Sequence, residues 1–319
     1  MADERKAPGS ACAAMTLNEL RYIVAVAEHR HFGKAARACC ISQPTLSTQI
    51  KKLEEQLGVV LFERTNKSVR PTPVGDKVVR KARKVLDEID DIRMLCRSDV
   101  QPLCGTRTLG VIPTLAPYLL PWLLPPLRHA YPALELVVVE DLTERLIARL
   151  REHSLDVAMV ALPIAQGDLV EVPLFDEPFY VACPAGHRLA RAGAIALAEL
   201  QRESILYLAD GHCLRDQALA ICGAVDGHGG DFRAASLETL RQLVAAGLGF
   251  TLLPALAIPD SPRHLPGVAV RPFAGTANRR IGLVCRTSYS HIGELDLLAE
   301  VIGAQLPASV RPIGAAPHQ

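Results

Sequence analysis

The chain changes its pattern near residue 107, and this change constrains the fold more than any other feature of the sequence. Residues 16–96 contain helical segments, interrupted only by two short β-like runs around a basic turn at 59–75. From residue 107 onwards, short apolar runs that are typical of buried strands alternate with helical segments. We therefore predict a mainly helical N-terminal part followed by a larger α/β part.

The α/β part contains several strand candidates, at 108–112, 134–140, 155–162, 179–183, 204–209, 249–253 and 281–285. Because strands and helices alternate with short connections, we expect largely parallel sheets in two small lobes. Sheets of this type bind ligands at the C-terminal ends of their strands, here between the lobes. The sequence lacks a G-x-G-x-x-G or P-loop motif, which disfavours nucleotide binding, and shows neither Ser-His-Asp nor H-E-x-x-H ordering.

The N-terminal part is predicted to begin with two helices, at 16–29 and 32–40. Thr16 is a candidate N-cap, and Glu19 follows it at capping-box spacing. The second helix is rich in alanine, which suits close packing between helices.

A third helix, 41–58, opens with Ser42 as N-cap and Pro44 in its first turn, and ends at Gly58. One face should be buried, because an apolar stripe runs along Leu46, Ile50, Leu53 and Leu57. The opposite face carries short hydrogen-bonding side chains and then cations, at Gln43, Thr45, Ser47, Thr48, Gln49, Lys51 and Lys52. Such a face suits base edges and phosphates in a DNA major groove, although a solvated surface helix would look similar.

The basic turn that follows predicts a β wing near a phosphate backbone, with Arg64, Lys67 and Arg70 as its cations. Residues 1–97 contain 18 Lys and Arg against 12 Asp and Glu, whereas the rest of the chain is net acidic. This asymmetry supports an anionic polymer as the partner of the first part only.

The stretch FGKAARACCISQPTLSTQIKKLEEQLGVVLFERTNKSVRPTPVG resembles the winged helix-turn-helix of the LysR-type transcriptional regulators. The resemblance implies double-stranded promoter DNA and RNA polymerase as partners. The residues implied or expected at the DNA are Gln43, Pro44, Thr45, Ser47, Gln49, Lys51 and Arg64.

A long linker helix is predicted at 76–97. Its apolar residues follow a heptad seam, at Val78, Ala82, Val85, Ile89, Ile92 and Cys96. One helix cannot bury this seam alone, so we expect a homodimer, unless the seam packs against the chain's own second domain. A polar hinge at 98–107 follows.

Two cysteines lie nine positions apart on one predicted helix, which starts at Cys213 and reaches Cys222. We expect Asp210 or Gly211 to cap this helix. The positive end of a helix stabilises a thiolate, and His212 and Arg215 would add positive charge. A thiolate attacks the O–O bond of a peroxide to give a sulfenic acid, which a second thiol converts to a disulfide.

The helical spacing separates the two Cα atoms by roughly 13 Å. A disulfide requires about 4.4–6.8 Å, so this pair cannot bond unless the segment unwinds. Oxidation would then act as a conformational switch. The alternative is two core cysteines on a buried helix face.

The segments GHCLRDQAL, GVIPTLAPYLLP, VPLFDEPFYVA and FRAASLETLRQLVAAGLGFTLLPALAIP look like the peroxide-sensing branch of the same family. This resemblance implies a two-lobed α/β regulatory domain similar to periplasmic binding proteins, and a homotetramer. It implies Cys213 as the peroxidatic cysteine and Cys222 as the resolving one. Hydrogen peroxide would be held by Thr114, Thr143 and His212, with Asp216 and either Arg279 or Arg280 near the thiol. A thioredoxin- or glutaredoxin-type reductant would reverse the disulfide.

We expect a disordered extension at 1–14, a DNA-binding domain at 15–75, a sensing domain at 108–307 and a tail at 308–319. Nine cysteines without an export signal, and no apolar run long enough to span a membrane, favour a cytoplasmic protein. Metal ligands at C-x-x-C spacing are absent, so we expect no metal or cofactor. Two other functions compete: a LysR-type regulator that binds a small metabolite between its lobes, and a thiol peroxidase.

Overall fold

The computed structural model describes residues 15–64, 69–95, 103–164, 166–201, 203–223, 233–259 and 265–313. The chain divides into two compact units, residues 1–100 and 101–319. Lys67, Cys12, Cys96, the N-terminal extension and residues 98–102 of the hinge lie outside the described residues.

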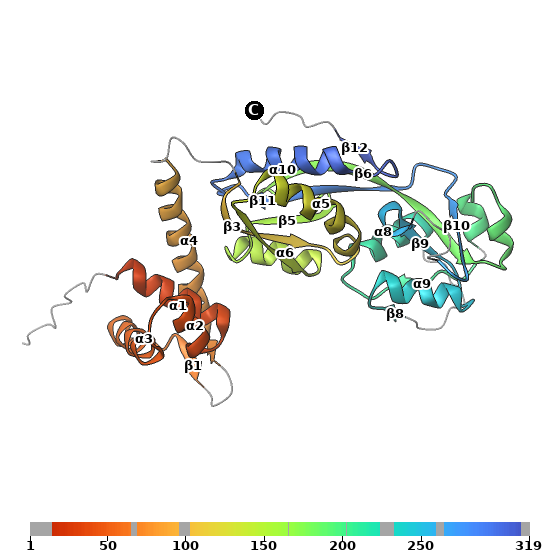
Figure 1. Cartoon of the computed structure of the whole chain (residues 1–319). Helices are drawn as coiled ribbons and strands as arrows, with labels where there is room; N and C mark the ends of the chain where they lie inside the picture. Colours follow the sequence, from red (N-terminus) through yellow and green to blue (C-terminus); the bar gives the residue numbers. More distant parts are fainter. Residues whose placement is uncertain are drawn as a thin grey trace, which may run out of the picture. The chain divides into compact units, whose positions relative to one another are not determined.

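The N-terminal unit contains helices α1 (Leu17–His29), α2 (Phe32–Ala38), α3 (Gln43–Leu57) and α4 (Pro73–Leu95), with strands β1 (Phe62–Arg64) and β2 (Val69–Pro71) between α3 and α4. The predicted caps are confirmed. Thr16 and Glu19 form a capping box, and the Ser42 side chain accepts a 3.2 Å hydrogen bond from the Thr45 amide. Gly58 ends α3 with a positive φ of 66°. The helix-turn-helix and the wing of the N-terminal unit are visible in Figure 1.

The buried stripe of α3 is shorter than predicted. Leu46, Ile50 and Leu53 lie in the core of the unit, but Leu57 is 38% exposed. Leu57 occupies the last turn, immediately before the chain leaves the helix at Gly58, so the prediction was wrong for this residue.

Helix α4 begins at Pro73, three residues earlier than predicted, because a proline is well suited to a first helical position. Ala82 of the heptad seam is buried, whereas Val85 and Ile92 are 43% and 59% exposed. Dimerisation through the exposed residues of this seam stays a prediction.

The second unit is built on an eight-stranded sheet. Six of its strands have the order β10-β6-β11-β5-β3-β4, and β9 and β12 complete the eight by pairing with β6. The strands are β3 (Gly105–Val111), β4 (Leu134–Glu140), β5 (Val157–Leu162), β6 (Leu169–Pro184), β9 (Thr251–Pro254), β10 (Val268–Pro272), β11 (Asn278–Arg286) and β12 (Arg311–Pro312). Within this sheet as described, the parallel pairings are those of β3 with β4 and with β5, and every pairing of β6 and β11 is antiparallel. The expectation of largely parallel sheets was therefore wrong.

The two lobes share the long strand β6. Its first half pairs with β11 in the first lobe, and its second half pairs with β9 and β10 in the second. Each lobe has its own apolar core. Sequence patterning marked only 179–183 as a strand, because Asp176, Glu177 and Pro178 interrupt the apolar run.

Helices complete both lobes (Figure 1). The first has α5 (Ala116–Ala130), α6 (Thr143–Arg151) and α10 (Ile292–Gln305), and α10 contacts α5, β6 and β11. The second has η1 (Arg188–Arg191), α7 (Leu197–Leu200), α8 (Cys213–Cys222), α9 (Leu237–Ala245) and η2 (Ala255–Ala257), with the short parallel strands β7 (Tyr207–Leu208) and β8 (Arg233–Ala234). Within the predicted tail, Arg311–Pro312 form β12, which pairs with β6.

Among the described residues, no helix combines the length and apolar character needed to cross a membrane.

Candidate functional site

A small pocket lies between the lobes, beside the N-terminus of α8. It is lined by Ile112, Pro113, Thr114, Leu142, Thr143, Gly211, His212 and Cys213. The first three follow β3, and Leu142 and Thr143 form the start of α6, shortly after β4. Parallel strands bring these two loops to one edge of the sheet, as predicted for a ligand site.

Cys213 is the first residue of α8 and is half-buried, with its side chain packed against the core of the first lobe. The N-cap is His212 rather than Asp210 or Gly211. Gly211 precedes it at a positive φ of 91°, a conformation that favours glycine. A Cβ at Gly211 would also lie 3.0 Å from Leu142 Cδ1, so this glycine keeps the turn beside the pocket compact.

Among the described residues, neither His212 nor Arg215 supplies the positive charge that was expected beside the Cys213 thiol. Burial lowers the pKa of His212, so the imidazole is neutral at pH 7. Arg215 turns away from the pocket, because its Nε lies 3.0 Å from Asp210 Oδ1 and its guanidinium stacks over the Tyr207 ring. The N-terminus of α8, the positive end of the helix dipole, lies at Cys213.

The two threonines offer different hydrogen-bonding capacity to a small ligand. Thr143 Oγ1 is buried without a hydrogen-bond partner among the described residues. Thr114 is buried, and its Oγ1 accepts a 2.8 Å hydrogen bond from Arg279 Nη1. Because that oxygen already accepts a hydrogen bond, the Thr114 hydroxyl hydrogen remains available to donate.

The structure distinguishes the two candidate arginines. Arg279 is buried and forms an ion pair with Glu177, in which Nε and Oε2 are 2.8 Å apart and both side chains are 0% exposed. Arg280 points to the opposite face of β11 and pairs with Asp176 at the surface. Of the two alternatives, Arg279 is therefore the one that reaches the pocket residue Thr114, and Arg280 is not, because successive side chains of a strand alternate between its faces.

Sequence reasoning missed two residues around the pocket. Glu177 holds Arg279 in place and also accepts a 2.8 Å hydrogen bond from the Leu256 amide. An acid inside the apolar run VPLFDEPFYVA was the signal, since a buried carboxylate needs a partner. Gln217 lies one helical turn after Cys213, and its Oε1 is buried without a partner among the described residues. Asp216, in contrast, is exposed in the first turn of α8.

Cys222 lies at the other end of α8, in the core of the second lobe. Burial raises the pKa of its thiol to about 11, so the group is protonated and unreactive at neutral pH. Cys183 and Cys285 are likewise buried free thiols, and Cys40 is exposed. Among the described residues, no group of three or more His, Cys, Asp and Glu side chains could hold a metal ion.

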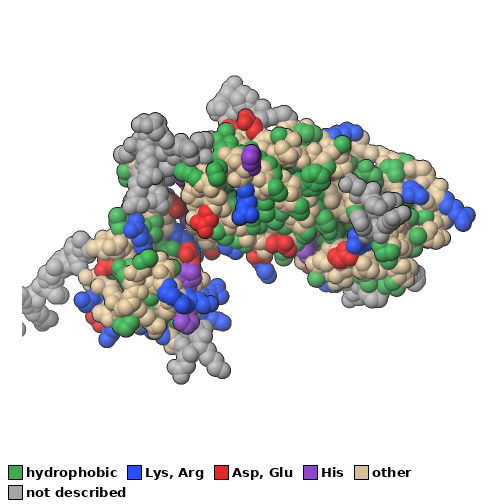
Figure 2. Space-filling view, viewed as in Figure 1, with side chains coloured by type: hydrophobic (Ala, Val, Ile, Leu, Met, Phe, Trp, Pro, Cys, Tyr) green, Lys and Arg blue, Asp and Glu red, His purple; other side chains and the backbone are tan. Residues whose placement is uncertain are grey.

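The candidate DNA-reading surface is the outer face of α3 with β1. Gln43, Pro44, Thr45 and Lys51 are exposed, and Ser47 and Gln49 are half-buried. Lys51 pairs with Glu55 along the helix at 3.8 Å. Figure 2 shows Lys and Arg side chains on the surface of the N-terminal unit, where they are accessible to a polyanion.

Arg64 is held by two contacts to α3 and one contact to α2. It donates to Ser47 Oγ and to Glu54 Oε2, both at 3.2 Å, and its guanidinium lies 4.7 Å from the centre of the Phe32 ring. Glu54, which the sequence analysis did not single out, also accepts hydrogen bonds from the Leu61 and Phe62 amides. This carboxylate therefore joins the wing to the reading helix.

Two family models match the chain. The bacterial regulatory helix-turn-helix protein, lysR family, matches residues 17–76, and the LysR substrate binding domain matches residues 101–307. The DNA-binding transcriptional dual regulator OxyR of Escherichia coli is 45% identical over 297 residues, which cover 92% of this chain and 96% of that protein.

Solved structures give the same result. A cysteine-to-aspartate variant of full-length OxyR from Pseudomonas aeruginosa has a TM-score of 0.82 at 39% identity, covering 95% of this chain and 99% of that one. A cysteine-to-serine variant of OxyR from Corynebacterium glutamicum, with hydrogen peroxide bound, has a TM-score of 0.63 at 42% identity, covering 91% and 94%.

The fold and the two matched domains define a LysR-type transcriptional regulator, a DNA-binding protein rather than an enzyme. Within this class, the chain belongs to the OxyR family of hydrogen peroxide-responsive regulators.

Proposed function

We propose that Cys213 is the residue that reacts with hydrogen peroxide and that Cys222 resolves the product. The Cys213 thiolate attacks one peroxide oxygen, the O–O bond breaks, and hydroxide leaves as the cysteine becomes a sulfenic acid. The Cys222 thiol then displaces the sulfenic oxygen as water and forms the disulfide. The peroxide is reduced in the first step, and the two thiols together supply both electrons.

The observation that carries this proposal is the pocket around Cys213. It brings the thiol together with Thr114, Thr143 and a neutral His212 around one small pocket. Hydrogen peroxide both donates and accepts hydrogen bonds. The Thr114 hydroxyl can donate to one oxygen, and the unpartnered Thr143 Oγ1 can accept from the other. The relative from Corynebacterium glutamicum, solved with hydrogen peroxide bound, supports such a site in the family.

The positions of the two cysteines on α8 support a switch. Nine residues of helix separate their Cα atoms by roughly 13 Å, more than twice the usual span of a disulfide. Cys213 packs against the core of one lobe and Cys222 lies in the core of the other. Disulfide formation therefore requires α8 to unwind and Cys222 to leave its apolar surroundings.

In this proposal the remodelled regulatory unit changes how an oligomer of the chain contacts promoter DNA. A homodimer joined through α4, and a homotetramer of two such dimers, would present several copies of α3 to neighbouring half-sites. A change in their spacing would alter contact with RNA polymerase. A thioredoxin- or glutaredoxin-type protein of a reducing cytoplasm would restore the thiols.

Thiol mapping by mass spectrometry tests the assignment. The reduced full-length protein receives about one equivalent of hydrogen peroxide, is quenched with an alkylating reagent and is digested without reduction. We expect a linked peptide that contains Cys213 and Cys222. Cys213→Ser should abolish it, and Cys222→Ser should leave a sulfenic acid that a carbon nucleophile traps on Cys213.

Cys285→Ser is the matched control for Cys222→Ser, because burial raises the pKa of both thiols to about 11 while Cys285 lies in the core of the first lobe. It should leave the linked peptide unchanged. If peroxide oxidises other thiols while Cys213 remains fully alkylated, the proposed site is wrong.

A further inference from the structure

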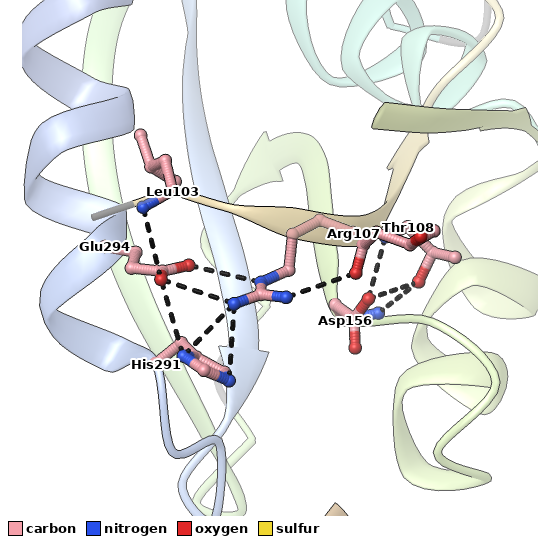
Figure 3. Close-up of polar contacts among 7 residues, drawn as sticks. Leu103, Arg107, Thr108, Asp156, His291 and Glu294 are labelled. Carbon is pink, nitrogen blue, oxygen red and sulfur yellow. Dashed lines mark hydrogen bonds and ion pairs between the residues drawn. The ribbon is translucent and has the colours of Figure 1, made fainter. Parts of the chain in front are cut away.

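A second polar cluster lies in the first lobe, where Arg107 of β3 meets His291 and Glu294 at the start of α10 (Figure 3). Arg107 Nε donates to Glu294 Oε2 at 3.2 Å, and its Nη2 lies 3.3 Å from Glu294 Oε1. The same Nη2 lies 3.3 Å and 3.4 Å from the two ring nitrogens of His291. These side chains are only 10–16% exposed, so water screens their interactions weakly.

Both charges of the pair are maintained. Burial alone would raise the pKa of Glu294, but the hydrogen bond from His291 and the charge of Arg107 outweigh this effect and lower it. Burial acts against the charge of Arg107 as well, yet Glu294 raises its pKa. The result is a stable ionic contact between β3 and the N-terminus of α10.

The cluster also contacts the first described residue of the regulatory unit. The Leu103 amide lies 3.4 Å from Glu294 Oε1, and the Leu103 side chain is buried in the core of the first lobe. Leu103 has a φ of 53°, a left-handed conformation that a leucine adopts only when its surroundings impose it. These contacts therefore fix the backbone at Leu103.

Thr108, which follows Arg107 in β3, is held by Asp156. Asp156 Oδ2 accepts hydrogen bonds from both the amide and the hydroxyl of Thr108, each at 2.7 Å, and the Asp156 amide donates to Thr108 Oγ1 at 2.9 Å. Arg107 and Thr108 thus fix the first half of β3 to α10 and to the turn before β5.

Strand β3 connects this cluster directly to the cysteine pocket. It runs from Gly105 to Val111, roughly 20 Å at the rise of a strand, and continues into the pocket residues at 112–114. It is paired on both sides, with β4 and with β5. A single strand, hydrogen-bonded on both sides, therefore joins the pocket residues to Arg107.

We propose that Arg107, His291 and Glu294 are positioning residues of the redox response. They hold the N-terminal end of β3 in place. A displacement at Thr114 therefore moves the start of the regulatory unit with the strand, because this end of β3 cannot move separately. This inference rests on the proposed reaction at Cys213. The three residues do not touch the pocket, so they leave the thiol chemistry itself unchanged.

The test separates thiol chemistry from its transmission. In the full-length chain, Glu294→Ala and Arg107→Met each break the cluster, and the second covers the case in which the first does not fold. Two readouts are compared: the rate at which peroxide links Cys213 to Cys222, and the length of promoter DNA protected by the reduced and the oxidised protein. We expect the linking rate to stay within about twofold, whereas the oxidation-dependent change in protected length falls to less than about half.

Glu294→Gln is the conservative variant, because its amide oxygen still accepts hydrogen bonds from Leu103 and Arg107. It should retain most of the footprint change even where it lowers thermal stability. Arg151→Gln is the control for loss of an ion pair in the same lobe, since Arg151 pairs with Asp168 at 2.7 Å on its surface. It should behave as wild type in both readouts.

A full footprint change in Glu294→Ala and Arg107→Met would overturn the inference, as would an equal loss in Arg151→Gln. Loss of the linking reaction in both cluster variants would also overturn it, because the cluster would then serve the fold as a whole. If the wild-type protein forms no Cys213–Cys222 link, the proposed function fails first and the inference fails with it.

Discussion

Arg279 of β11 binds Thr114, which lines the cysteine pocket in the loop after β3: Arg279 donates from Nη1 to Thr114 Oγ1 at 2.8 Å and from Nη2 to the Thr114 carbonyl at 3.1 Å. The arginine is held in turn by Glu177, also fully buried. The orientation of a threonine in the pocket thus depends on a buried ion pair.

This arrangement predicts a large effect of Arg279→Met. The substitution leaves the Glu177 carboxylate buried without a cation, which typically costs about 3–5 kcal/mol of unfolding free energy. Oxidation of Cys213 should also slow, because Thr114 loses its fixed orientation. Urea unfolding and thiol mapping measure the two effects.

Two controls accompany this prediction. Arg280→Gln removes the neighbouring exposed arginine and should change neither quantity. The double variant Arg279→Met with Glu177→Gln removes the orphaned charge and keeps an acceptor for the Leu256 amide. If the double variant is no more stable than Arg279→Met alone, the uncompensated charge is not the cause.

Gly211→Ala should both destabilise the protein and slow its oxidation. The positive φ of 91° imposes a strain of roughly 1–2 kcal/mol on a residue with a Cβ, and that Cβ would press on Leu142 in the pocket wall. Gly247→Ala is the control, since Gly247 has a φ of 83° but open space around it. It should lose similar stability in urea unfolding while Cys213 reacts at the normal rate. Equal slowing in both variants would exclude a specific effect of Leu142.

The buried His212 should make the folded protein less stable on mild acidification. Burial lowers its pKa in the folded state, whereas the unfolded chain has the ordinary value of about 6.5. The unfolded state therefore binds the proton first, so the contribution is fully present above about pH 6.5 and is lost as pH falls below it. His212→Gln should reduce the loss of unfolding free energy between about pH 7.5 and 5.5, measured with urea. An unchanged loss would show that other groups cause it.

Arg64→Gln should weaken DNA binding through a phosphate contact. Ser47, Glu54 and Phe32 fix the guanidinium beside the reading helix, which suits a single defined contact. The slope of log affinity against log salt concentration should fall by about 1, with little change in sequence preference. Arg128→Gln, at an exposed position on α5, should leave the slope unchanged. Loss of sequence preference with an unchanged slope would instead indicate a base contact.

Local chemistry made the N-terminal unit largely predictable. Helix starts at Thr16 and Ser42 and the end at Gly58 depend on capping groups within a few residues of one another, so the sequence alone identifies them. The same holds for Cys213 at the start of α8 and for the separation between Cys213 and Cys222, since both follow from helical geometry. The identity of the cap at His212 was missed because Gly211 takes the left-handed turn one residue earlier.

Other features depended on contacts between distant segments. A strand pattern shows which side chains are buried but not which strand lies beside it, so the antiparallel pairing of β6 with β11 could not be read from the sequence. That pairing decides which of Arg279 and Arg280 faces inward. The neutral state of His212 likewise depends on burial by residues far along the chain.

The sequence by itself determined the helix-turn-helix, the alternation of strands and helices, and a cysteine pair too far apart on one helix to bond, because each depends on periodicity and caps within a short window. Only the tertiary structure decided that Thr114, Thr143, His212 and Cys213 share one pocket, that Arg279 serves it, and that Arg107 reaches Glu294. Those contacts join residues up to 187 positions apart, and only the packing of the sheet and its helices brings them together.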